Sequence, residues 1–153
     1  MNAPRLVTHP GICNNTALRK AARRLTRFYD TCMAETGLRA TQYAILSLLA
    51  TRGPTTMAAL ADLLSMDRAT MGHNLRPLER DGLVTIQVGR EDRREREVAL
   101  SNSGARMEAQ SKPSWQKAQA CFEKEFGKED ALAMRRLMVR IAQLELSVDQ
   151  AIT

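Results

Sequence analysis

Residues 67–101 read DRATMGHNLRPLERDGLVTIQVGREDRREREVALS, and the hydrophobic period changes inside this stretch. Its first part has apolar residues at helical spacing, with Asp67 placed to cap the helix and Gly82 to end it. Over residues 84–88 apolar and polar residues alternate, and the alternation resumes over 98–100 after a charged loop. A helix, ending at residue 81, and a β-hairpin are therefore predicted to follow each other directly.

A short helix is predicted immediately before this stretch. Residues 56–64, TMAALADLL, carry small side chains on one side, which allow another helix to pack closely. Only Ser65 and Met66 separate it from the helix that begins at Asp67. Two short helices joined by a tight turn form the outline of a helix-turn-helix, and a hairpin directly after it is a wing.

Two further helices are predicted on the N-terminal side. Residues 16–36 have apolar side chains at helical spacing over four turns, and Gly37 is expected to cap the C-terminus. Residues 41–52 are apolar on nearly all sides, so this helix is expected to be central and buried. Thr41 is predicted as its N-cap.

On the C-terminal side, residues 102–126 are predicted to form one broken helix, because Pro113 forces a kink or a local break. Gly127 separates it from a final helix. The apolar stripes of the first helix and the last two exceed what a small winged domain needs to cover, which predicts a homodimer. The predicted fold class is mainly α with a small β-hairpin wing, a winged helix-turn-helix plus a helical dimerisation region.

The composition is that of one globular domain with basic character. The chain has 153 residues, of which 44% are hydrophobic and 26% charged, values that exclude global disorder. Its net charge of +6 and pI near 9.7 favour a polyanionic partner such as nucleic acid or an anionic membrane surface. No stretch approaches the apolar length of a spanning helix, and residues 1–11 do not resemble a signal peptide. A cytoplasmic protein is expected.

Signatures of metal, cofactor and catalytic chemistry are missing from the sequence. Its three cysteines form no closely spaced pair, which argues against a disulfide framework, and its two histidines are too far apart for a structural zinc cluster. The eight glycines build neither a dinucleotide-binding nor a phosphate-binding loop. We therefore expect neither an enzyme nor a cofactor, and the six aromatics form no stacking platform for single strands, so duplex DNA is the favoured nucleic acid.

Three segments in register resemble one known family. Residues 37–46, GLRATQYAIL, resemble the entry to its second helix, and residues 75–84, LRPLERDGLV, the end of its recognition helix. Residues 92–94, DRR, followed by residues 98–101, VALS, resemble its wing. The family is the MarR family (multiple antibiotic resistance regulators) of winged-helix transcription factors, and the resemblance extends over about residues 17–152.

This resemblance implies a dimer that binds palindromic operators in double-stranded DNA, usually as a repressor. It also implies DNA release when a small effector, often phenolic or lipophilic, binds between the dimerisation and DNA-binding regions. The basic charge of the N-terminal arm and first helix could in addition serve an anionic effector. The predicted regions are residues 1–36, the N-terminal arm and first helix, for dimerisation; 37–101, the winged helix-turn-helix, for DNA; and 102–153, the C-terminal helices, for dimerisation. Cysteine oxidation at Cys13 is an alternative trigger, and a winged-helix protein-interaction module without DNA binding is an alternative function.

Polar side chains in the first turns of a recognition helix are the ones that reach base edges in the major groove. The candidates here are Arg68, Thr70, His73 and Asn74, with Arg76 further along the helix for phosphate contacts. Asp67 is expected to cap the helix, because a carboxylate near phosphate is repelled. Two residues depart from the family pattern, since relatives commonly carry arginine in place of His73 and serine or threonine in place of Gly72. A glycine in a helix interior suggests a close approach there.

At the wing, Arg93 and Arg94 resemble the arginines that enter the minor groove, where negative potential attracts a guanidinium. Asp92 resembles the acidic partner that orients Arg94. The excess of basic charge lies elsewhere, however. Residues 66–100 hold seven Lys and Arg against seven Asp and Glu, whereas residues 1–40 hold seven against two. DNA binding by the predicted interface therefore depends on where particular arginines point, not on bulk charge.

Tyr29 and Trp115 are candidates for an effector pocket, although packing is the favoured role for both. Cys32 and Cys121 lie on apolar stripes and are predicted to be core residues. Cys13 precedes the first helix, and its neighbours in the sequence offer no cation that would lower the thiol pKa. The residues that bind an effector are not predicted.

Overall fold

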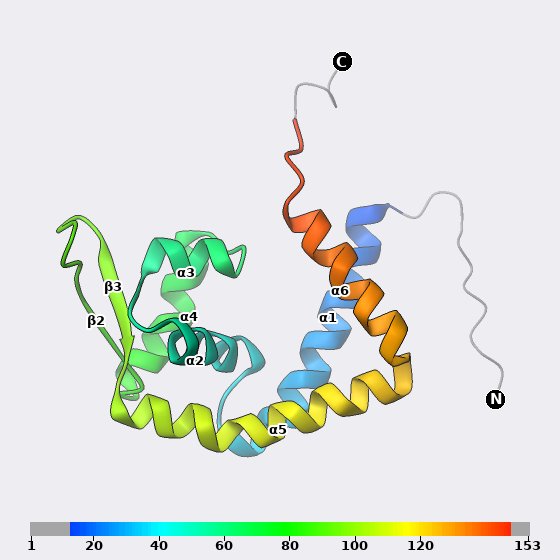
Figure 1. The fold of residues 1–153 in the computed structure, drawn as a ribbon, viewed down its shortest axis with the longest axis horizontal. Coiled ribbons are helices and arrows are strands. Elements are labelled where there is room, and N and C mark those ends of the chain that lie inside the picture. Colours follow the sequence, from blue (N-terminus) through cyan, green and yellow to red (C-terminus); the bar gives the residue numbers. More distant parts are fainter. Residues whose placement is uncertain (1–12, 148–153) are drawn as a thin grey trace.

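The computed structural model describes residues 13–147. Its elements in chain order are α1 (Asn14–Met33), the 3-10 helix η1 (Ala34–Thr36), α2 (Ala40–Arg52), β1 (Thr55–Thr56), α3 (Met57–Leu63), α4 (Arg68–Arg80), β2 (Val84–Val88), β3 (Arg96–Leu100), α5 (Asn102–Phe126) and α6 (Lys128–Ala142). The long helix α5 joins a winged part, made of α2 to α4 and the strands, to α1 and α6 at its other end (Figure 1). The predicted N-terminal arm over residues 1–12, and residues 148–153, lie outside the described residues.

The core of the winged part is built around α2, as its apolar sequence predicts. Helices α2 and α4 each bury one set of apolar side chains against the other elements: Tyr43, Ile45, Leu46 and Leu49 from α2, and Met71, Leu75 and Leu78 from α4. The spacing of three and four residues in α4 places its buried set on one side of the helix. The opposite side of α4 is consequently left to solvent.

The predicted hairpin is present, with one strand more than the sequence analysis expected. Strands β2 and β3 pair antiparallel, with Ile86 opposite Val98. The two-residue strand β1 pairs with the other edge of β3, with Thr55 opposite Val98, so the sheet order is β1-β3-β2. Val98 is fully buried at the centre of this sheet. The wing is therefore fixed to the helix-turn-helix through β1 as well as through the turn after α4.

The helix boundaries correct two details. Helix α1 begins at Asn14, and its last turn is the 3-10 helix η1, which ends at Gly37 with φ 77° as the predicted cap. Thr41 is not the N-cap of α2, which begins at Ala40 with Arg39 in the cap position. The Asp30 carboxylate accepts the Ala40 N–H at 2.8 Å, so a side chain from α1 already satisfies this helix start.

Helix α5 is continuous, so the predicted break at Pro113 is wrong. Proline removes one backbone donor and crowds the preceding turn, but Pro113 lies on the exposed side of the helix. The buried residues of α5 are Gly104, Ser111 and Ala118, spaced by seven on the other side. Packing along that side holds the helix together, and water can reach the carbonyl that lacks a partner.

A close backbone contact fixes the start of α5 against the end of α4. Ser101 caps α5 by accepting the Gly104 N–H at 2.9 Å, and its hydroxyl donates to the Gly82 carbonyl at 2.6 Å. The Ser101 N–H donates to the Leu83 carbonyl at 3.1 Å. A Cβ atom on Gly104 would lie 1.9 Å from the same Leu83 oxygen, so only glycine fits here.

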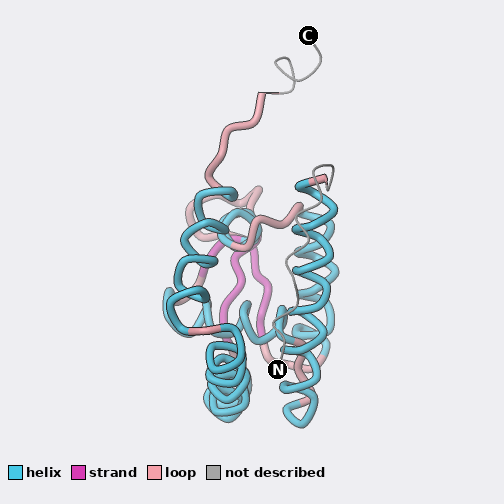
Figure 2. The backbone as a smooth tube through the Cα atoms, turned by 90° about the vertical axis from the view of Figure 1, so that its right-hand side faces the viewer, coloured by secondary structure: helices cyan, strands magenta, loops and turns pink. Residues whose placement is uncertain are grey.

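The end of the molecule that is formed by α1 and α6 leaves many apolar side chains exposed. Helix α6 packs mainly against the last turns of α5, and Figure 2 shows α1 and α6 as two separate columns on either side of the view. Many large apolar side chains of α6 and the residues after it are exposed: Leu132, Leu137, Met138, Val139, Ile141, Leu144 and Leu146. None of the helices that the structure describes is long and apolar enough to cross a membrane.

Candidate DNA-binding interface and the adjacent cavity

Helix α4 exposes three of the side chains that are predicted to contact DNA. Arg68, His73 and Arg76 are all exposed, and among residues 13–147 their side chains make no hydrogen bond or ion pair. On a helix wheel, His73 and Arg76 lie opposite the buried side formed by Met71 and Leu75. These two residues are therefore the most protruding of the predicted set.

The start of α4 is capped by Asp67, as predicted. One carboxylate oxygen accepts the Thr70 N–H and the other accepts the Thr70 hydroxyl, both at 2.8 Å. These hydrogen bonds, the backbone one first, hold the pKa of Asp67 below its ordinary value. The Thr70 hydroxyl is consequently committed to the cap and would have to leave it to contact a base.

The side chain of Asn74 is also engaged in a hydrogen bond within the helix. Its side-chain amide donates to the Thr70 carbonyl one turn earlier at 2.8 Å, and the residue is half-buried. The structure thus divides the five predicted residues into three that project freely and two, Thr70 and Asn74, that bond locally. Gly72 has no atom within 4 Å of where its Cβ would lie, so no part of the described chain makes the predicted close approach.

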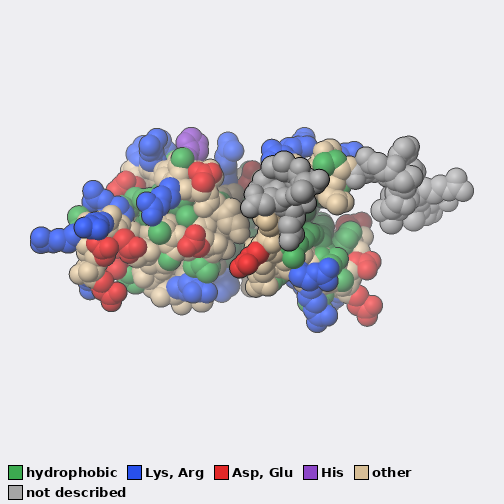
Figure 3. All heavy atoms as spheres, turned by 90° about the horizontal axis from the view of Figure 1, so that it is seen from above, with side chains coloured by type: hydrophobic (Ala, Val, Ile, Leu, Met, Phe, Trp, Pro, Cys, Tyr) green, Lys and Arg blue, Asp and Glu red, His purple; other side chains and the backbone are tan. Residues whose placement is uncertain are grey.

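The wing presents two exposed arginines on a hydrogen-bonded turn. The Gly89 N–H donates to the Glu95 carbonyl at 2.9 Å, and the Asp92 carboxylate accepts the Arg94 N–H at 2.8 Å. Asp92 therefore shapes the backbone beneath Arg94 and forms no ion pair with its guanidinium. Arg93 and Arg94 both extend into solvent. Basic and acidic side chains are interspersed over the winged part, which agrees with the balanced charge count (Figure 3).

A cavity of about 410 Å³ lies between α1, α5 and α6, beside the start of α2. Its lining residues are Ala22, Leu25, Thr26, Tyr29, Ala40, Trp115, Gln119, Phe122, Met134 and Arg135. Tyr29 and Trp115 thus line a cavity, and Trp115 also stacks on Tyr43 with ring centroids 6.0 Å apart. Sequence analysis missed Gln119 and Arg135, because no local spacing indicates how α5 and α6 fold back on each other or which of their residues meet α1.

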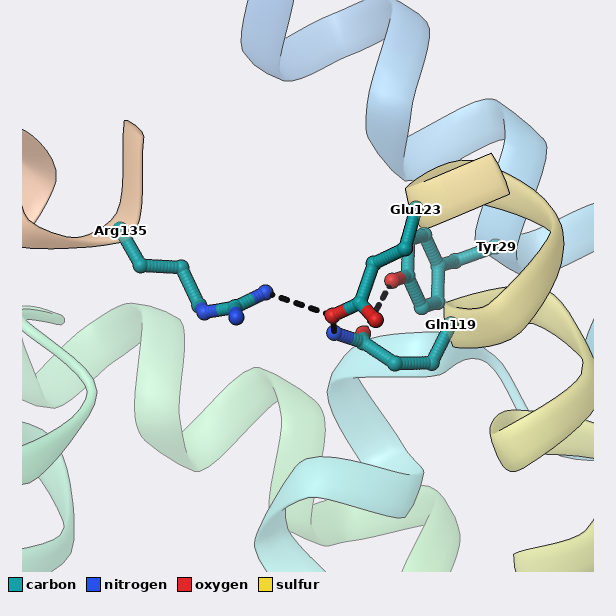
Figure 4. A network of polar contacts seen from close by, with 4 residues as sticks. All are labelled: Tyr29, Gln119, Glu123 and Arg135. Carbon is teal, nitrogen blue, oxygen red and sulfur yellow. Dashed lines mark hydrogen bonds and ion pairs between the residues drawn. The ribbon is translucent and has the colours of Figure 1, made fainter. Parts of the chain in front are cut away.

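Three lining residues, Tyr29, Gln119 and Arg135, belong to a series of polar contacts that links α1, α5 and α6 (Figure 4). Tyr29 on α1 donates to the Gln119 side-chain oxygen at 2.5 Å, and the Gln119 amide donates to Glu123 at 2.8 Å. Arg135 on α6 donates to the same Glu123 oxygen at 2.9 Å. Burial raises the pKa of the Tyr29 hydroxyl, so it remains protonated and able to donate at neutral pH.

The cysteines differ in exposure from what their sequence positions predict. Cys121 is exposed, so its prediction as a core residue is wrong, while Cys32 is half-buried. Cys13 is exposed at the N-cap position of α1. Hydrogen bonds from the backbone and side chain of Thr16 lower the pKa of the Cys13 thiol. The sequence analysis considered only neighbouring cations as a cause of a lowered pKa and did not predict these hydrogen bonds.

A helix-turn-helix, a wing and an outward helix side with basic residues define a winged-helix protein. The family model described as "MarR family" matches residues 38–95. The solved structure of the M. tuberculosis transcriptional regulator MosR in complex with DNA is 30% identical, with 86% of this chain and 94% of that chain covered and a TM-score of 0.76. The chain belongs to the MarR family.

Two more distant structures share the fold. PcaV, a transcriptional regulator from Streptomyces coelicolor solved with its natural ligand, is 20% identical, with 95% of this chain and 100% of that chain covered and a TM-score of 0.77. CouR from Rhodococcus jostii RHA1, solved with p-coumaroyl-CoA, is 19% identical, with 87% and 94% covered and a TM-score of 0.73. Comparison with curated proteins gives no match.

Proposed function

We propose that this protein is a cytoplasmic, homodimeric transcriptional regulator, and not an enzyme, which binds a palindromic operator in duplex DNA and acts as a repressor. Helix α4 enters the major groove, and the wing arginines Arg93 and Arg94 reach the minor groove. The observation that carries the proposal is the exposed set on α4 that has no partner in the described chain: His73 and Arg76 on the outward side, and Arg68 at the first position of the helix. The DNA complex of MosR supports this assignment.

Dimerisation is proposed to use residues 1–36 and 102–153, leaving residues 37–101 for DNA. Helix α6 exposes apolar side chains on several sides, and Leu137 and Leu144 are each about half exposed, at 49% and 54%. An apolar surface of this extent on a soluble protein is covered by a partner, and a second copy of the chain is the occupant we propose.

The cavity beside α2 is the proposed effector site. It lies where the helical end of the molecule meets the winged part, and a volume of about 410 Å³ suits a small ligand. PcaV and CouR, which share this fold, were each solved with a bound ligand, and this supports a small-molecule effector for the present chain. Occupancy of the cavity would favour one placement of the winged part over another and so weaken DNA binding.

The test of this function is footprinting with the full-length chain on the DNA that flanks its own gene. We expect protection of a palindromic sequence, with an affinity that falls steeply as salt concentration rises because phosphate contacts release counterions. Protection that is absent at low salt, for a protein that is folded and dimeric, would contradict DNA binding and favour the protein-interaction alternative. A parallel assay with peroxide addresses the second trigger, since the exposed Cys13 has a lowered pKa: loss of binding that requires Cys13 would favour redox control.

Removing the Arg94 side chain by Arg94→Ala is expected to weaken operator binding by about 5- to 150-fold, because an arginine that contacts the bases contributes about 1–3 kcal/mol. The slope of the logarithm of affinity against the logarithm of salt concentration should fall by about 1. Arg19→Ala, which removes the same charge from the exposed side of α1, is the matched control and should leave affinity nearly unchanged. Equal affinities for Arg94→Ala and the unaltered protein, at unchanged thermal stability, would remove the wing from the interface.

A further inference from the structure

The cavity between α1, α5 and α6 has a single charged lining residue, Arg135. Its remaining lining residues, all within the described part of the chain, are apolar or neutral, and they include the rings of Tyr29, Trp115 and Phe122. Flat apolar walls with one cation at the edge complement a ligand that has an aromatic body and one anionic group. The volume of about 410 Å³ accommodates one substituted ring with a short side chain.

Arg135 already has an anionic partner in the described structure. Glu123, which does not line the cavity, accepts a hydrogen bond from Arg135 at 2.9 Å. The same oxygen accepts the Gln119 amide at 2.8 Å, and these two hydrogen bonds lower the pKa of Glu123, that from Gln119 first. Glu123 therefore stays ionised at neutral pH and keeps the Arg135 guanidinium directed toward α5, as Figure 4 shows.

The ion pair is weak enough to be exchanged. The side chain of Arg135 is 45% exposed and that of Glu123 is 22% exposed, so water screens the attraction between them. A guanidinium binds a carboxylate best through two parallel hydrogen bonds, whereas Arg135 makes one hydrogen bond to Glu123. A ligand carboxylate that reaches Arg135 from the cavity could accept two parallel hydrogen bonds from the guanidinium.

We propose that Glu123 is a built-in competitor for the carboxylate of an aromatic acid effector, and that such an effector binds by replacing Glu123 as the partner of Arg135. This inference rests on the proposed role of the cavity as the effector site. It makes Glu123 a specificity residue: it disfavours acids that bind weakly to the apolar walls, and it has no effect on neutral ligands. The exchange also releases the one ion pair that joins α5 to α6 among the described residues.

The test compares phenylacetate with its neutral analogue phenylacetamide by titration calorimetry on four dimeric full-length proteins: unaltered, Glu123→Gln, Arg135→Gln and the double variant. Glutamine retains an acceptor for Gln119 and removes the competing charge. We expect Glu123→Gln to bind phenylacetate roughly two- to fivefold more tightly, a gain of the size that an exposed ion pair provides, and to leave phenylacetamide binding unchanged. Arg135→Gln should lose the preference for the acid, and the double variant should match Arg135→Gln.

Each contrary result has a defined meaning. Phenylacetate binding that is no tighter to Glu123→Gln, or tightening that is equal for acid and amide, overturns competition by charge. No binding of either compound to any folded variant overturns the aromatic-acid assignment of the cavity. Binding of the ligand-free, unaltered protein to its footprinted duplex is measured alongside. If that binding is retained, the proposed function stands even where this inference fails, and if it is lost the proposed function itself has failed.

Discussion

Gly104→Ala is expected to destabilise the protein by about 3 kcal/mol, at the upper end of what overpacking costs. The added Cβ would lie 1.9 Å from the Leu83 carbonyl oxygen and 2.9 Å from the carbonyl carbon, and both are backbone atoms that cannot turn aside as a side chain would. To relieve the clash, the start of α5 must move away from the turn after α4. That movement strains the hydrogen bonds from Ser101 to Gly82 and Leu83. Urea unfolding followed by circular dichroism measures the change.

Gly72→Ala is the matched control, since it makes the same substitution in the interior of another helix. The space around Gly72 is open, so alanine should stabilise the protein by up to about 1 kcal/mol through its better helix propensity. If both variants are equally stable, the close contact at Gly104 does not constrain the fold. The control has a second use, because Gly72→Ala places a methyl group beside the proposed DNA-reading side. Weaker operator binding by this more stable variant would locate a close approach of DNA at Gly72.

The double substitution Leu137→Glu with Ile141→Glu is expected to convert the dimer into a monomer. These residues lie one turn apart on the same side of α6, and both are exposed in the single chain. Burying an unpaired charge costs about 3–5 kcal/mol, which lowers the dimer affinity by at least about a hundredfold. Light scattering after size-exclusion chromatography gives the mass. Operator affinity should fall with it, because the two half-sites would no longer be bound by linked subunits.

Leu63→Glu is the control for this experiment. Leu63 is an exposed leucine of α3, 42% accessible, outside the proposed dimerisation region. It should leave the protein dimeric. If the double variant remains a dimer at micromolar concentration while keeping its helical content, the partner does not cover this side of α6. The apolar surface of α6 would then need a different occupant.

The elements that sequence analysis predicted correctly depend on local patterns. The helix over α4 follows from apolar residues at helical spacing and from Asp67, whose carboxylate caps within three residues. The hairpin follows from strict alternation. The errors depend on contacts between distant segments: β1 has two residues and exists because it pairs with β3, and the start of α2 is capped by Asp30 from another helix. Local preference cannot indicate such partners.

The same distinction applies to the sites. Arg68, His73 and Arg76 could be proposed because a helix with one buried side must expose the other. The cavity could not be predicted, because its lining residues come from four helices, and the sequence of one helix does not indicate how it packs against the other three. The local hydrogen bonds of Thr70 and Asn74 could not be predicted either, because a polar side chain in a helix can turn toward the backbone or toward a ligand.

The unbroken course of α5 has a mechanical consequence. Its 25 residues span about 37 Å at 1.5 Å per residue, with one end fixed against the turn after α4 and the other beside Arg135. A stiff rod of that length amplifies a small tilt: about 5° at the cavity end displaces the winged end by about 3 Å. Two recognition helices must match the 34 Å repeat of B-form DNA simultaneously. A change of a few ångströms in their separation is therefore enough to prevent the two recognition helices from entering the major grooves of both half-sites at the same time.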